Sequence, residues 1–301
     1  MSPAPTVAIV ILNWNGLADT RECLDSLRAV TYPNARIIVV DNGSAGPEGQ
    51  LLREEFGDFI ALLGSETNLG FAGGANLGIQ RALQQGADYV LLLNNDTIVQ
   101  PAFLSSLVEC AQSLPELAAA CPRTYFYDRP DVIYSTGGMV SVWKGTARQV
   151  GRGRPDRGQF ERVEARDYAD GVCMLIPRAA LERVGLLDED YFAYWEETDW
   201  CARAREMGLK CYYVPDAKVW HKAARSQTPD AGFHYLYRRN ALLFVRKRGT
   251  WLQVISALLM HLFVYGPLYF LRHPTNIARA AAEARALLWH TSNQARHRPL
   301  V

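Results

Sequence analysis

The sequence lacks the features that would place it in several common classes of protein. None of its six cysteines lies in a C-x-x-C pair, so neither a zinc site nor a disulfide framework is indicated, and we expect reduced thiols in a cytosolic compartment. Its 32 basic and 31 acidic residues leave a net charge of +1, which gives nucleic acid no overall attraction as a partner. The N-terminus lacks the basic start and long apolar run of a signal peptide, so we expect the main folded part in the cytoplasm.

The first third of the chain does contain a regular alternation of strand-like and helix-like segments. Apolar runs at 7–12 and 36–40 are rich in β-branched residues, which is typical of parallel strands buried on both faces. Shorter strands are predicted at 59–63 and 89–93, with helical spacing of apolar residues between the runs. The alternation predicts an α/β fold with a parallel sheet flanked by helices. A chain of 301 residues can form one large domain, or one domain with appendages.

Polar residues follow three of these predicted strands. Asn13 ends the first run, Asp41 ends the second, and VLLLNNDT places Asn94, Asn95 and Asp96 after the strand at 89–93. Ligands of such sheets bind at the carboxyl ends of the strands, and a short cluster of oxygen donors there suits Mg²⁺ or Mn²⁺ shared with a phosphate. Ordinary turn chemistry is the alternative, because Asn and Asp are also common turn residues.

The pattern becomes less regular after Pro101. It predicts a helix at 103–113, a hairpin near 137–142, a strand at 172–176, a helix over 191–207 and strands at 211–214 and 219–221. The acids early in 191–207, the arginines late in it and the glycine after it match the helix dipole and a glycine C-cap. Three arginines, three glycines and a proline lie in 151–159, where we expect a mobile loop. Those arginines are either solvated or in contact with a diphosphate.

Seven short segments occur in a fixed order along residues 7–248: VAIVILNWNG, VVDNGS, NLGFAGGAN, LLLNNDT, ADGVCMLIPR, FAYWEETDWCARAREMG and VWH. Together they resemble family 2 glycosyltransferases of the GT-A fold, and most closely the rhamnosyltransferase-like branch of polysaccharide assembly. The resemblance implies a Rossmann-like, mixed and mostly parallel sheet flanked by helices, with a helical extension at the C-terminus. It also implies the residue roles that follow.

On the nucleotide side, Asp41 is expected to accept a hydrogen bond from the base, since a carboxylate can accept the imide N–H of uracil or thymine. An Asx-turn or a helix cap is the alternative for Asp41. Asn68, Gly70, Gly73 and Gly74 would let the backbone approach the nucleotide closely. The other expected donor-side residues are Asn13, Asn94 and Asn95.

Asp96 matches the last acid of the family's DxD-type motif, which binds the metal on the diphosphate, here Mg²⁺ or Mn²⁺. The first position of that motif is Asn94, an amide instead of an acid, which removes charge at the metal and suggests contacts with ribose or sugar. His221 resembles the second metal ligand of the family. A single histidine is more often structural, so this role depends on the resemblance.

Glu196 and Glu197 stand at the family's ED motif, and the resemblance implies that Glu197 is the general base. Two adjacent acids raise the proton affinity of one of them, which suits a base working near neutral pH. The alternative is that both acids only decorate a helix N-terminus. Asp170, Gly171 and Glu196 are expected on the acceptor side, and Asp199 is expected to brace the helix or an arginine.

The implied reaction is a single inverting displacement. The donor would be dTDP-rhamnose or a UDP-sugar, and the acceptor a hydroxyl of a glycan or a lipid-linked acceptor. Three rival functions remain at this point: a catalytically silent module that binds sugar nucleotide or glycan, a sugar nucleotidyltransferase, and a two-carboxylate glycosidase.

Residues 251–271 contain no Asp, Glu, Lys or Arg and are flanked by basic residues, which fits the length and flanks of a membrane span. Internal polar residues and a break at Gly266-Pro267 suit a hairpin or an interfacial helix pair instead, and a buried or dimer-forming helix is the third alternative. We therefore divide the chain into a catalytic domain at 1–225 and a helical region at 226–301. The catalytic domain has a nucleotide-sugar half at 1–100 and an acceptor half at 101–225. The protein is expected in the cytoplasm, with peripheral binding at the inner face of the cell membrane as an alternative.

Overall fold

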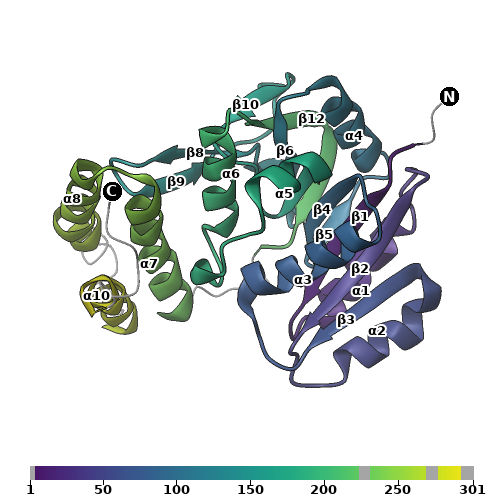
Figure 1. Ribbon diagram of the computed structural model, residues 1–301, viewed down its shortest axis with the longest axis horizontal. Coiled ribbons are helices and arrows are strands. Elements are labelled where there is room, and N and C mark those ends of the chain that lie inside the picture. Colours follow the sequence, from purple (N-terminus) through teal and green to yellow (C-terminus); the bar gives the residue numbers. More distant parts are fainter. Residues whose placement is uncertain (1–3, 224–230, 269–276, 293–301) are drawn as a thin grey trace.

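The computed structural model describes residues 4–223, 231–268 and 277–292 (Figure 1). Its strands are β1 Val7–Asn13, β2 Ala35–Asn42, β3 Ile60–Ser65, β4 Tyr89–Asn94, β5 Thr97–Val99, β6 Leu117–Phe126, β7 Arg129–Ser135, β8 Gly138–Ser141, β9 Thr146–Gln149, β10 Glu164–Arg166, β11 Cys173–Pro177 and β12 Lys210–His221. Ten of them form one sheet in the order β10-β12-β6-β11-β4-β1-β2-β3, with β5 beside β12 and β7 beside β6. The sheet is mixed, and β3, β2, β1 and β4 are parallel. The predicted α/β architecture is confirmed.

The helices are α1 Leu17–Leu27, α2 Glu48–Phe56, α3 Gly70–Gln84, α4 Phe103–Ser113, α5 Arg178–Val184, α6 Glu196–Glu206, α7 Ala231–Arg248, α8 Trp251–Met260 and α10 Ile277–Ser292. Short 3₁₀ turns, η1 and η2, lie at Gly57–Phe59 and Glu189–Tyr191, and η3 at His261–Tyr265 is a π-helix. Figure 1 shows α7, α8 and α10 at one end of the molecule, on the far side of α6 from β2 and β3.

Two apolar layers hold the parallel strands between helices. In β1, Val10 packs in the layer that contains Ile79 of α3, whereas its neighbour Ile9 packs in the layer that contains Leu24 of α1 and Leu52 of α2. Alternate residues of a strand point to opposite faces, so a strand covered on both sides must be apolar throughout. This is why continuous apolar runs predicted these strands correctly.

Several predicted boundaries in the second half were wrong. The helix expected over 191–207 begins only at Glu196, because Phe192, Tyr194 and Trp195 have positive φ angles that no right-handed helix contains. The two strands expected at 211–214 and 219–221 are one strand, β12, with a bulge between Val214 and Lys218. A bulge inserts extra residues without ending the pairing, so the polar interruption at 215–218 was misleading.

The irregular segment at 151–159 is fastened to the sheet, contrary to the mobile loop that we expected. Arg123 of β6 is buried, and its Nη1 lies 2.7 Å from Asp156 Oδ2. Tyr125 Oη donates to the same carboxylate oxygen at 2.6 Å. The expected hairpin is present as β8 paired with β9.

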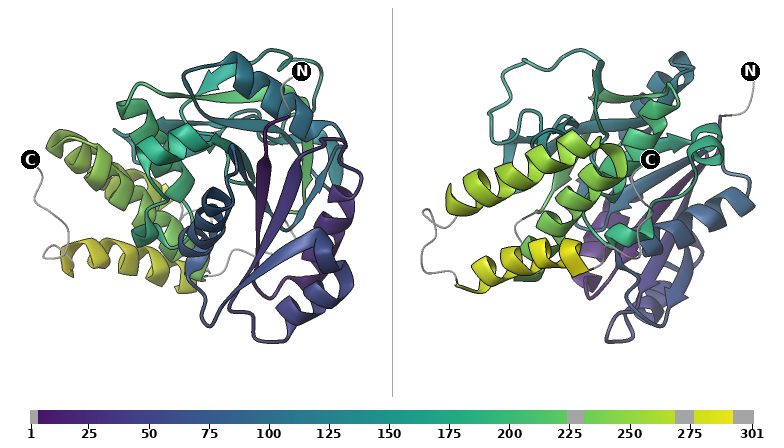
Figure 2. Two further views of the ribbon diagram at one scale, coloured as in Figure 1. Left: turned by 45° about the vertical axis from the view of Figure 1, so that its right-hand side comes forward. Right: turned by 60° about the vertical axis from the view of Figure 1, so that its left-hand side comes forward.

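The C-terminal helices pack on one another and on the elements that precede α6. Helix α7 contacts α10, α8, α6 and η2, and Figure 2 shows the three helices as a group beside the rest of the fold. The helical run that starts with α8 continues through Gly266 and Pro267 to Leu268, so the break expected there is not found in this part of the chain. The remainder of the predicted stretch, 269–271, lies outside the described residues.

Candidate active site

The carboxyl ends of β1, β2 and β4 lie together at one edge of the sheet. Asn13 pairs with Asp41 in the register of β1 and β2, and Leu12 pairs with Asn94 in the register of β1 and β4. The three polar strand ends that were singled out in the sequence are therefore neighbours in space. This edge is where ligands bind in parallel sheets.

Asp41 is held by the turn that follows it. Its Oδ1 accepts from Ser44 Oγ at 2.5 Å, and its Oδ2 accepts from the Gly49 N–H in the first turn of α2 at 3.2 Å. The Asx-turn and helix-cap contacts that we considered as the alternative are thus present. Oδ1 also accepts from the Ser44 N–H at 3.4 Å and from Asn13 Nδ2 at 3.5 Å. Oδ2 accepts the Gly49 bond alone among the described residues, so this oxygen keeps acceptor capacity for a nucleotide base.

Asn13 is fully buried and bonded on all sides. Its Nδ2 donates to Glu48 Oε2 at 2.8 Å and to Ser44 Oγ at 3.2 Å, while its Oδ1 accepts from Thr20 Oγ1 at 2.7 Å. Asn95 Nδ2 donates to the same Thr20 hydroxyl at 2.9 Å. Through these hydrogen bonds, Asn13 and Asn95 hold the residues around the strand ends in place. The Asn94 side chain, by contrast, has no hydrogen-bond partner among the residues that the structure describes.

Asn68 and Gly70 form a tight turn into α3. Asn68 Oδ1 accepts from the Gly70 N–H at 2.8 Å, and Gly70 has φ +73°. A Cβ at Gly70 would lie 2.3 Å from the carbonyl oxygen of Phe192, so only glycine fits. Gly73 and Gly74 need a different explanation from the one the sequence suggested. They lie inside α3, where a Cβ would meet the side chains of Leu69 and of Leu12 in β1, so their small size serves packing within the protein.

Asp96 and His221 come from distant parts of the chain and meet at the end of β4. The pairing of β5 with β12 places His221 opposite Thr97, and His221 Nε2 lies 3.1 Å from Asp96 Oδ1. Both side chains are buried, and His221 Nδ1 has no hydrogen-bond partner among the described residues. The two residues that the resemblance implies as metal ligands therefore lie together, and their binding of a metal stays a prediction.

This pair fits a divalent cation. A carboxylate suits Mg²⁺ or Mn²⁺, imidazole is a frequent metal ligand, and the 3.1 Å between the two donor atoms lets both reach one ion. Within the described part of the chain, no group of three or more His, Cys, Asp or Glu residues could hold a metal. The remaining ligands would therefore be diphosphate oxygens or water, as is usual for Mg²⁺ sites that share a phosphate.

Glu196 and Glu197 are the first two residues of α6, and their surroundings raise the pKa of both carboxyl groups. Burial, followed by the negative charge of Asp170, raises the pKa of the Glu197 carboxyl to about 7. Burial and the charge of Glu197 hold the pKa of the Glu196 carboxyl well above its usual range. One oxygen of each carboxyl, Oε2, is buried without a hydrogen-bond partner among the described residues. A group with a pKa near 7 is suited to take a proton at neutral pH.

Asp170 and Gly171 lie between the two parts of the site. A Cβ at Gly171 would lie 3.4 Å from Glu197 Cγ, and Asp170 Oδ2 accepts from Gln149 Nε2 at 2.7 Å. The next residue, Val172, accepts a hydrogen bond from the Asn94 N–H at 2.9 Å. The acceptor-side segment therefore runs directly beside the end of β4.

Two further side chains complete this connection: Tyr134, which the sequence did not single out, and Arg152, one of the arginines considered in the segment 151–159. The Tyr134 ring meets His221 edge-on, with centroids 4.6 Å apart, and the Arg152 guanidinium lies 4.3 Å from the centre of the Tyr134 ring. Arg152 Nη1 also donates to Gln149 Oε1. A chain of contacts thus leads from Asp96 and His221 to Asp170 and Glu197. In the segment 151–159, Arg152 is thus linked to His221 through the ring of Tyr134.

Other buried charges near the site support its frame. Asp199 is fully buried and accepts from Tyr191 Oη, Arg203 Nε and Arg248 Nε, as expected for a structural acid. Lys222 follows His221 and was not predicted, although it lies next to the VWH segment. Its Nζ lies 2.8 Å from Asp19 Oδ1 and 2.8 Å from Glu22 Oε2, which ties the end of β12 to α1.

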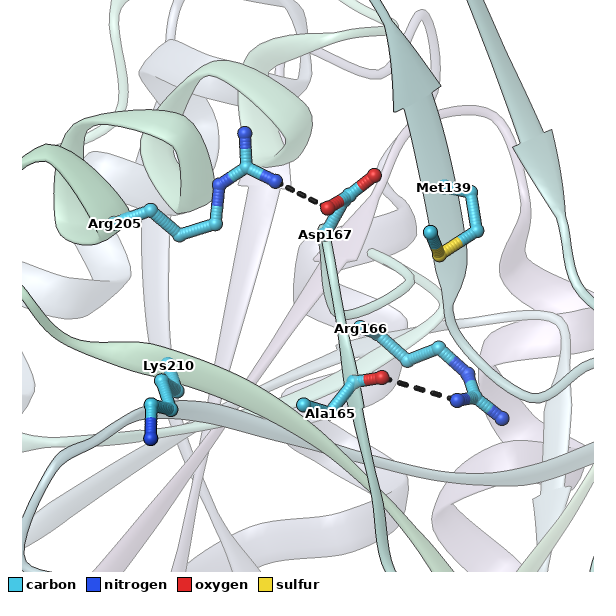
Figure 3. Close-up of a pocket in the computed structure, with 6 residues that line it drawn as sticks. All are labelled: Met139, Ala165, Arg166, Asp167, Arg205 and Lys210. Atoms are coloured by element: carbon cyan, nitrogen blue, oxygen red, sulfur yellow. Dashed lines mark hydrogen bonds and ion pairs between the residues drawn. The ribbon is translucent and has the colours of Figure 1, made fainter.

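The pocket drawn in Figure 3 is not part of this site. It is lined by Met139, Ala165, Arg166, Asp167, Arg205 and Lys210, and it lies at the start of β12, whereas His221 is at the end of that strand. Figure 3 shows its cations pointing in different directions: Arg205 reaches Asp167, and Arg166 reaches the Ala165 carbonyl. Such an arrangement does not converge on an anion.

The fold and the edge at which its polar residues meet define a glycosyltransferase of the GT-A fold. Residues 8–185 match the family described as Glycosyl transferase family 2, and the chain belongs to that family. A low-salt glycan biosynthesis hexosyltransferase, Agl10 of Haloferax volcanii, is 28% identical over 77% of this chain and 72% of its own. An N-acetylglucosaminyl-diphospho-decaprenol L-rhamnosyltransferase of Mycobacterium tuberculosis is 26% identical over 76% of this chain and 80% of its own.

Among solved structures, the mannosyltransferase PcManGT from Pyrobaculum calidifontis, in complex with GDP-Man and Mn²⁺, superposes with a TM-score of 0.61. The match is 15% identical and covers 98% of this chain and 77% of that one, so it shows the fold. The chain is thus a family 2 glycosyltransferase, as its motifs predicted, and it is similar to rhamnosyltransferases. Sugar nucleotidyltransferase and glycosidase are no longer needed as explanations.

Proposed function

We propose that this glycosyltransferase is an inverting enzyme that moves a sugar from a dTDP- or UDP-linked donor to a hydroxyl of a lipid-linked or glycan acceptor. The observation that carries the proposal is the chain of contacts joining the Asp96–His221 pair to Glu197. It links a metal-ligand pair suited to a diphosphate, through Tyr134, Arg152, Gln149 and Asp170, to a carboxyl whose pKa is about 7. A donor diphosphate and an acceptor hydroxyl could bind side by side there.

In this mechanism Glu197 takes the proton from the acceptor hydroxyl as that oxygen attacks the anomeric carbon. Its raised pKa makes it a stronger base than an ordinary carboxylate while leaving it ionised above pH 7. Attack from the face opposite the nucleotide inverts the anomeric configuration and needs no covalent enzyme intermediate. Asp96 and His221 would hold a divalent cation, which when bound neutralises charge on the leaving diphosphate. Arg152 places a further positive charge on that side of the site.

For the donor we assign the nucleotide base to Asp41 and the ribose or sugar to Asn94. Asp41 Oδ2 accepts one hydrogen bond from the described residues, that of the Gly49 N–H, and so keeps acceptor capacity for the base. The Asn94 amide lies at the end of β4 with no partner among the described residues, so it can both donate to and accept from sugar hydroxyls. Asn68 and Gly70 would shape the backbone around the nucleotide, and Asp170, Gly171 and Glu196 would border the acceptor.

The exposed face of α8 and the helical turns after it supports binding at a membrane surface. The run Trp251–Leu268 has a mean hydropathy of 1.5 and only 11% of it is buried, although length and composition alone are weak evidence for a span. Its exposed apolar residues are Trp251, Leu252, Ile255, Leu258, Leu259, Leu262, Phe263 and Leu268. An apolar face of this size marks an interaction surface. A lipid-linked acceptor, as named for the Mycobacterium relative, would be reached from there.

We therefore propose a catalytic domain at 1–225, whose nucleotide-sugar half is 1–100 and whose acceptor half is 101–225. The helical region at 226–301 would hold the enzyme against the inner face of the cell membrane, on its cytoplasmic side. Formation of a homodimer through α8 is the competing use of the same face. The two are separated by measuring vesicle binding and oligomeric state on the same preparation.

The proposed function is tested by a thermal-shift screen followed by transfer assays. We expect UDP or dTDP, and the matching nucleotide sugars, to raise the melting temperature in the presence of Mn²⁺ but much less without it. Transfer is then measured with the stabilising donor and a lipid-linked N-acetylglucosaminyl acceptor. Glu197→Ala should abolish turnover and keep nucleotide binding, whereas Glu182→Ala, at an exposed ion pair of α5, should change neither.

A catalytically silent binding module remains the alternative, since Asn94 and Glu197 both depart from the usual family residues. Such a module would bind nucleotide sugars and transfer none of them. Full activity of Glu197→Ala would instead disprove the assignment of the base. A melting temperature that responds equally with and without Mn²⁺ would contradict the role of Asp96 and His221.

A further inference from the structure

The segment that leads into Glu196 and Glu197 has a strained backbone. Phe192, Tyr194 and Trp195 have φ angles of +64°, +71° and +77°. Aromatic residues rarely adopt this left-handed region, because their Cβ atoms clash with the backbone, and they remain there only where surrounding contacts impose it. The contacts that impose it here come from outside the segment.

Asn240 of α7 supplies most of these contacts. It is fully buried, and its Nδ2 lies 2.8 Å from the carbonyl oxygens of Tyr191 and Ala193 and 2.7 Å from that of Tyr194. An amide nitrogen has two hydrogens, so three acceptors around it share them. One side chain thus binds three carbonyls of the turn directly before the acids.

Arg239 fixes the orientation of this amide. Its Nε donates to Asn240 Oδ1 at 2.8 Å, which turns the Asn240 nitrogen toward the segment. Its Nη2 donates to the carbonyl oxygens of Asp190 and Tyr191, both at 2.8 Å. The carbonyl between these groups, that of Phe192, accepts from the Ala72 N–H of α3 at 3.1 Å. Every carbonyl from residue 190 to residue 194 is therefore bonded to α7 or α3.

We propose that Asn240, oriented by Arg239, is a positioning residue that sets the path of the backbone into α6 and thereby the place of the Glu197 carboxylate. The inference rests on the proposed role of Glu197 as the base. It gives α7, which lies beyond the 8–185 match to the family, a part in the reaction. The segment and the acids it carries are far from Asn240 in sequence, so nothing local in the sequence indicates this part.

The test compares Asn240→Asp with Asn34→Asp. The first variant keeps the shape of the side chain but replaces the N–H donors with an oxygen facing three carbonyls. Asn34 makes a similar bond, from Nδ2 to the carbonyl of Ala4 at 2.9 Å, but lies at the opposite end of β2 from Asp41. Each variant is assayed for melting temperature, dTDP binding with Mn²⁺, and the pH profile of transfer with the donor and acceptor found active in the wild type.

We expect Asn240→Asp to lower kcat per folded molecule about 100-fold, because misplacement of a reacting group by about 1 Å costs roughly that much. Binding of dTDP should stay within about twofold of wild type. The acidic limb of the profile should move below pH 7, since a displaced Glu197 is reached by water. In the wild type, the titratable groups that act on Glu197 are Asp170, Glu196, Tyr168, Tyr237 and Cys201. Asn34→Asp should show none of these changes.

The proposal is overturned if Asn240→Asp lowers the melting temperature but keeps wild-type kcat per folded molecule and an unmoved acidic limb. If Asn240→Asp does not fold, Asn240→Ala, which buries no charge, undergoes the same measurements and the same criteria. Failure of the proposed function looks different. In that case the wild type transfers no sugar, or Glu197→Gln stays active, whereas loss of activity in Glu197→Gln with full activity in the Asn240 variant rejects the positioning role alone.

Discussion

The donor side and the acceptor side of this site are built in different ways. On the donor side, strand pairing within the sheet brings the polar strand ends together, and the buried side chains of Asn13 and Asn42 bond to the turns that follow them. On the acceptor side, the turn before Glu197 is held by Asn240, 47 positions after Ala193. The donor side is therefore built on the paired strands of the sheet, whereas the turn before Glu197 depends on a helix that lies outside the sheet.

If this difference is correct, the largest single effect should come from the donor side, where the metal pair is. Asp96→Asn should lower transfer about 1000-fold, because it removes a carboxylate ligand of the cation that would stabilise charge on the leaving diphosphate by several kcal/mol. It should also remove the Mn²⁺ dependence of nucleotide binding in a thermal-shift assay. Asp216→Asn is the control and should be silent, because Asp216 is an exposed acid on β12, the strand that carries His221. If the melting temperature of Asp96→Asn still responds to Mn²⁺, Asp96 is not required to bind the cation.

The contact between the two sides should rank next. Gly70→Ala places a Cβ 2.3 Å from the Phe192 carbonyl oxygen at a positive φ angle, so we expect a loss of about 2–4 kcal/mol in the free energy of unfolding. Denaturant titration measures it. Gly64→Ala on β3, where a Cβ meets nothing within 4 Å, should cost little. Equal stabilities of the two variants would mean that the turn at 191–195 moves away from α3 at little cost.

The buried Glu197 should lower the free energy of unfolding by an amount that depends on pH. The folded chain holds the Glu197 proton up to a pKa of about 7, whereas the unfolded chain releases it near its usual value of 4.5. Stability is thus lost as pH rises between these values, and the full cost is present above pH 7. Glu197→Gln should then be more stable than wild type at pH 8 by on the order of 1–3 kcal/mol, and the gain should shrink toward pH 5. A gain that is independent of pH would contradict this account.

The smallest effect should be on the exposed face of α8. Phe263 is 66% exposed. Phe263→Ser should weaken binding to anionic phospholipid vesicles about tenfold, given about 1.5–3 kcal/mol for burying such a side chain. Flotation with vesicles measures this, and transfer to a soluble acceptor should be unchanged. If the variant instead changes only the sedimentation of the protein alone, the face is a dimer interface.

How much could be predicted from the sequence follows the same division. Continuous apolar runs predicted the parallel strands, and the ordered motifs singled out Asp96 and His221, which the pairing of β5 with β12 brings together in the folded chain. The start of α6 could not be predicted, because acids near Tyr191 favour a helix and the left-handed turn that prevents it is imposed by Asn240. Tyr134, Lys222 and Arg239 were missed for the same reason: each acts through partners that only tertiary packing provides.

The close approach of Gly70 to Phe192 also couples the two substrates. Because the Ala72 N–H of α3 binds the Phe192 carbonyl, the first turn of α3 and the acceptor-side turn share one hydrogen bond. A donor that favours the present position of α3 would also favour the present position of that turn. If the donor thereby raises the affinity for the acceptor, the acceptor must raise the affinity for the donor by the same factor. If each substrate does favour its own turn, the first to bind should raise the affinity for the second, through a close approach that only glycine permits.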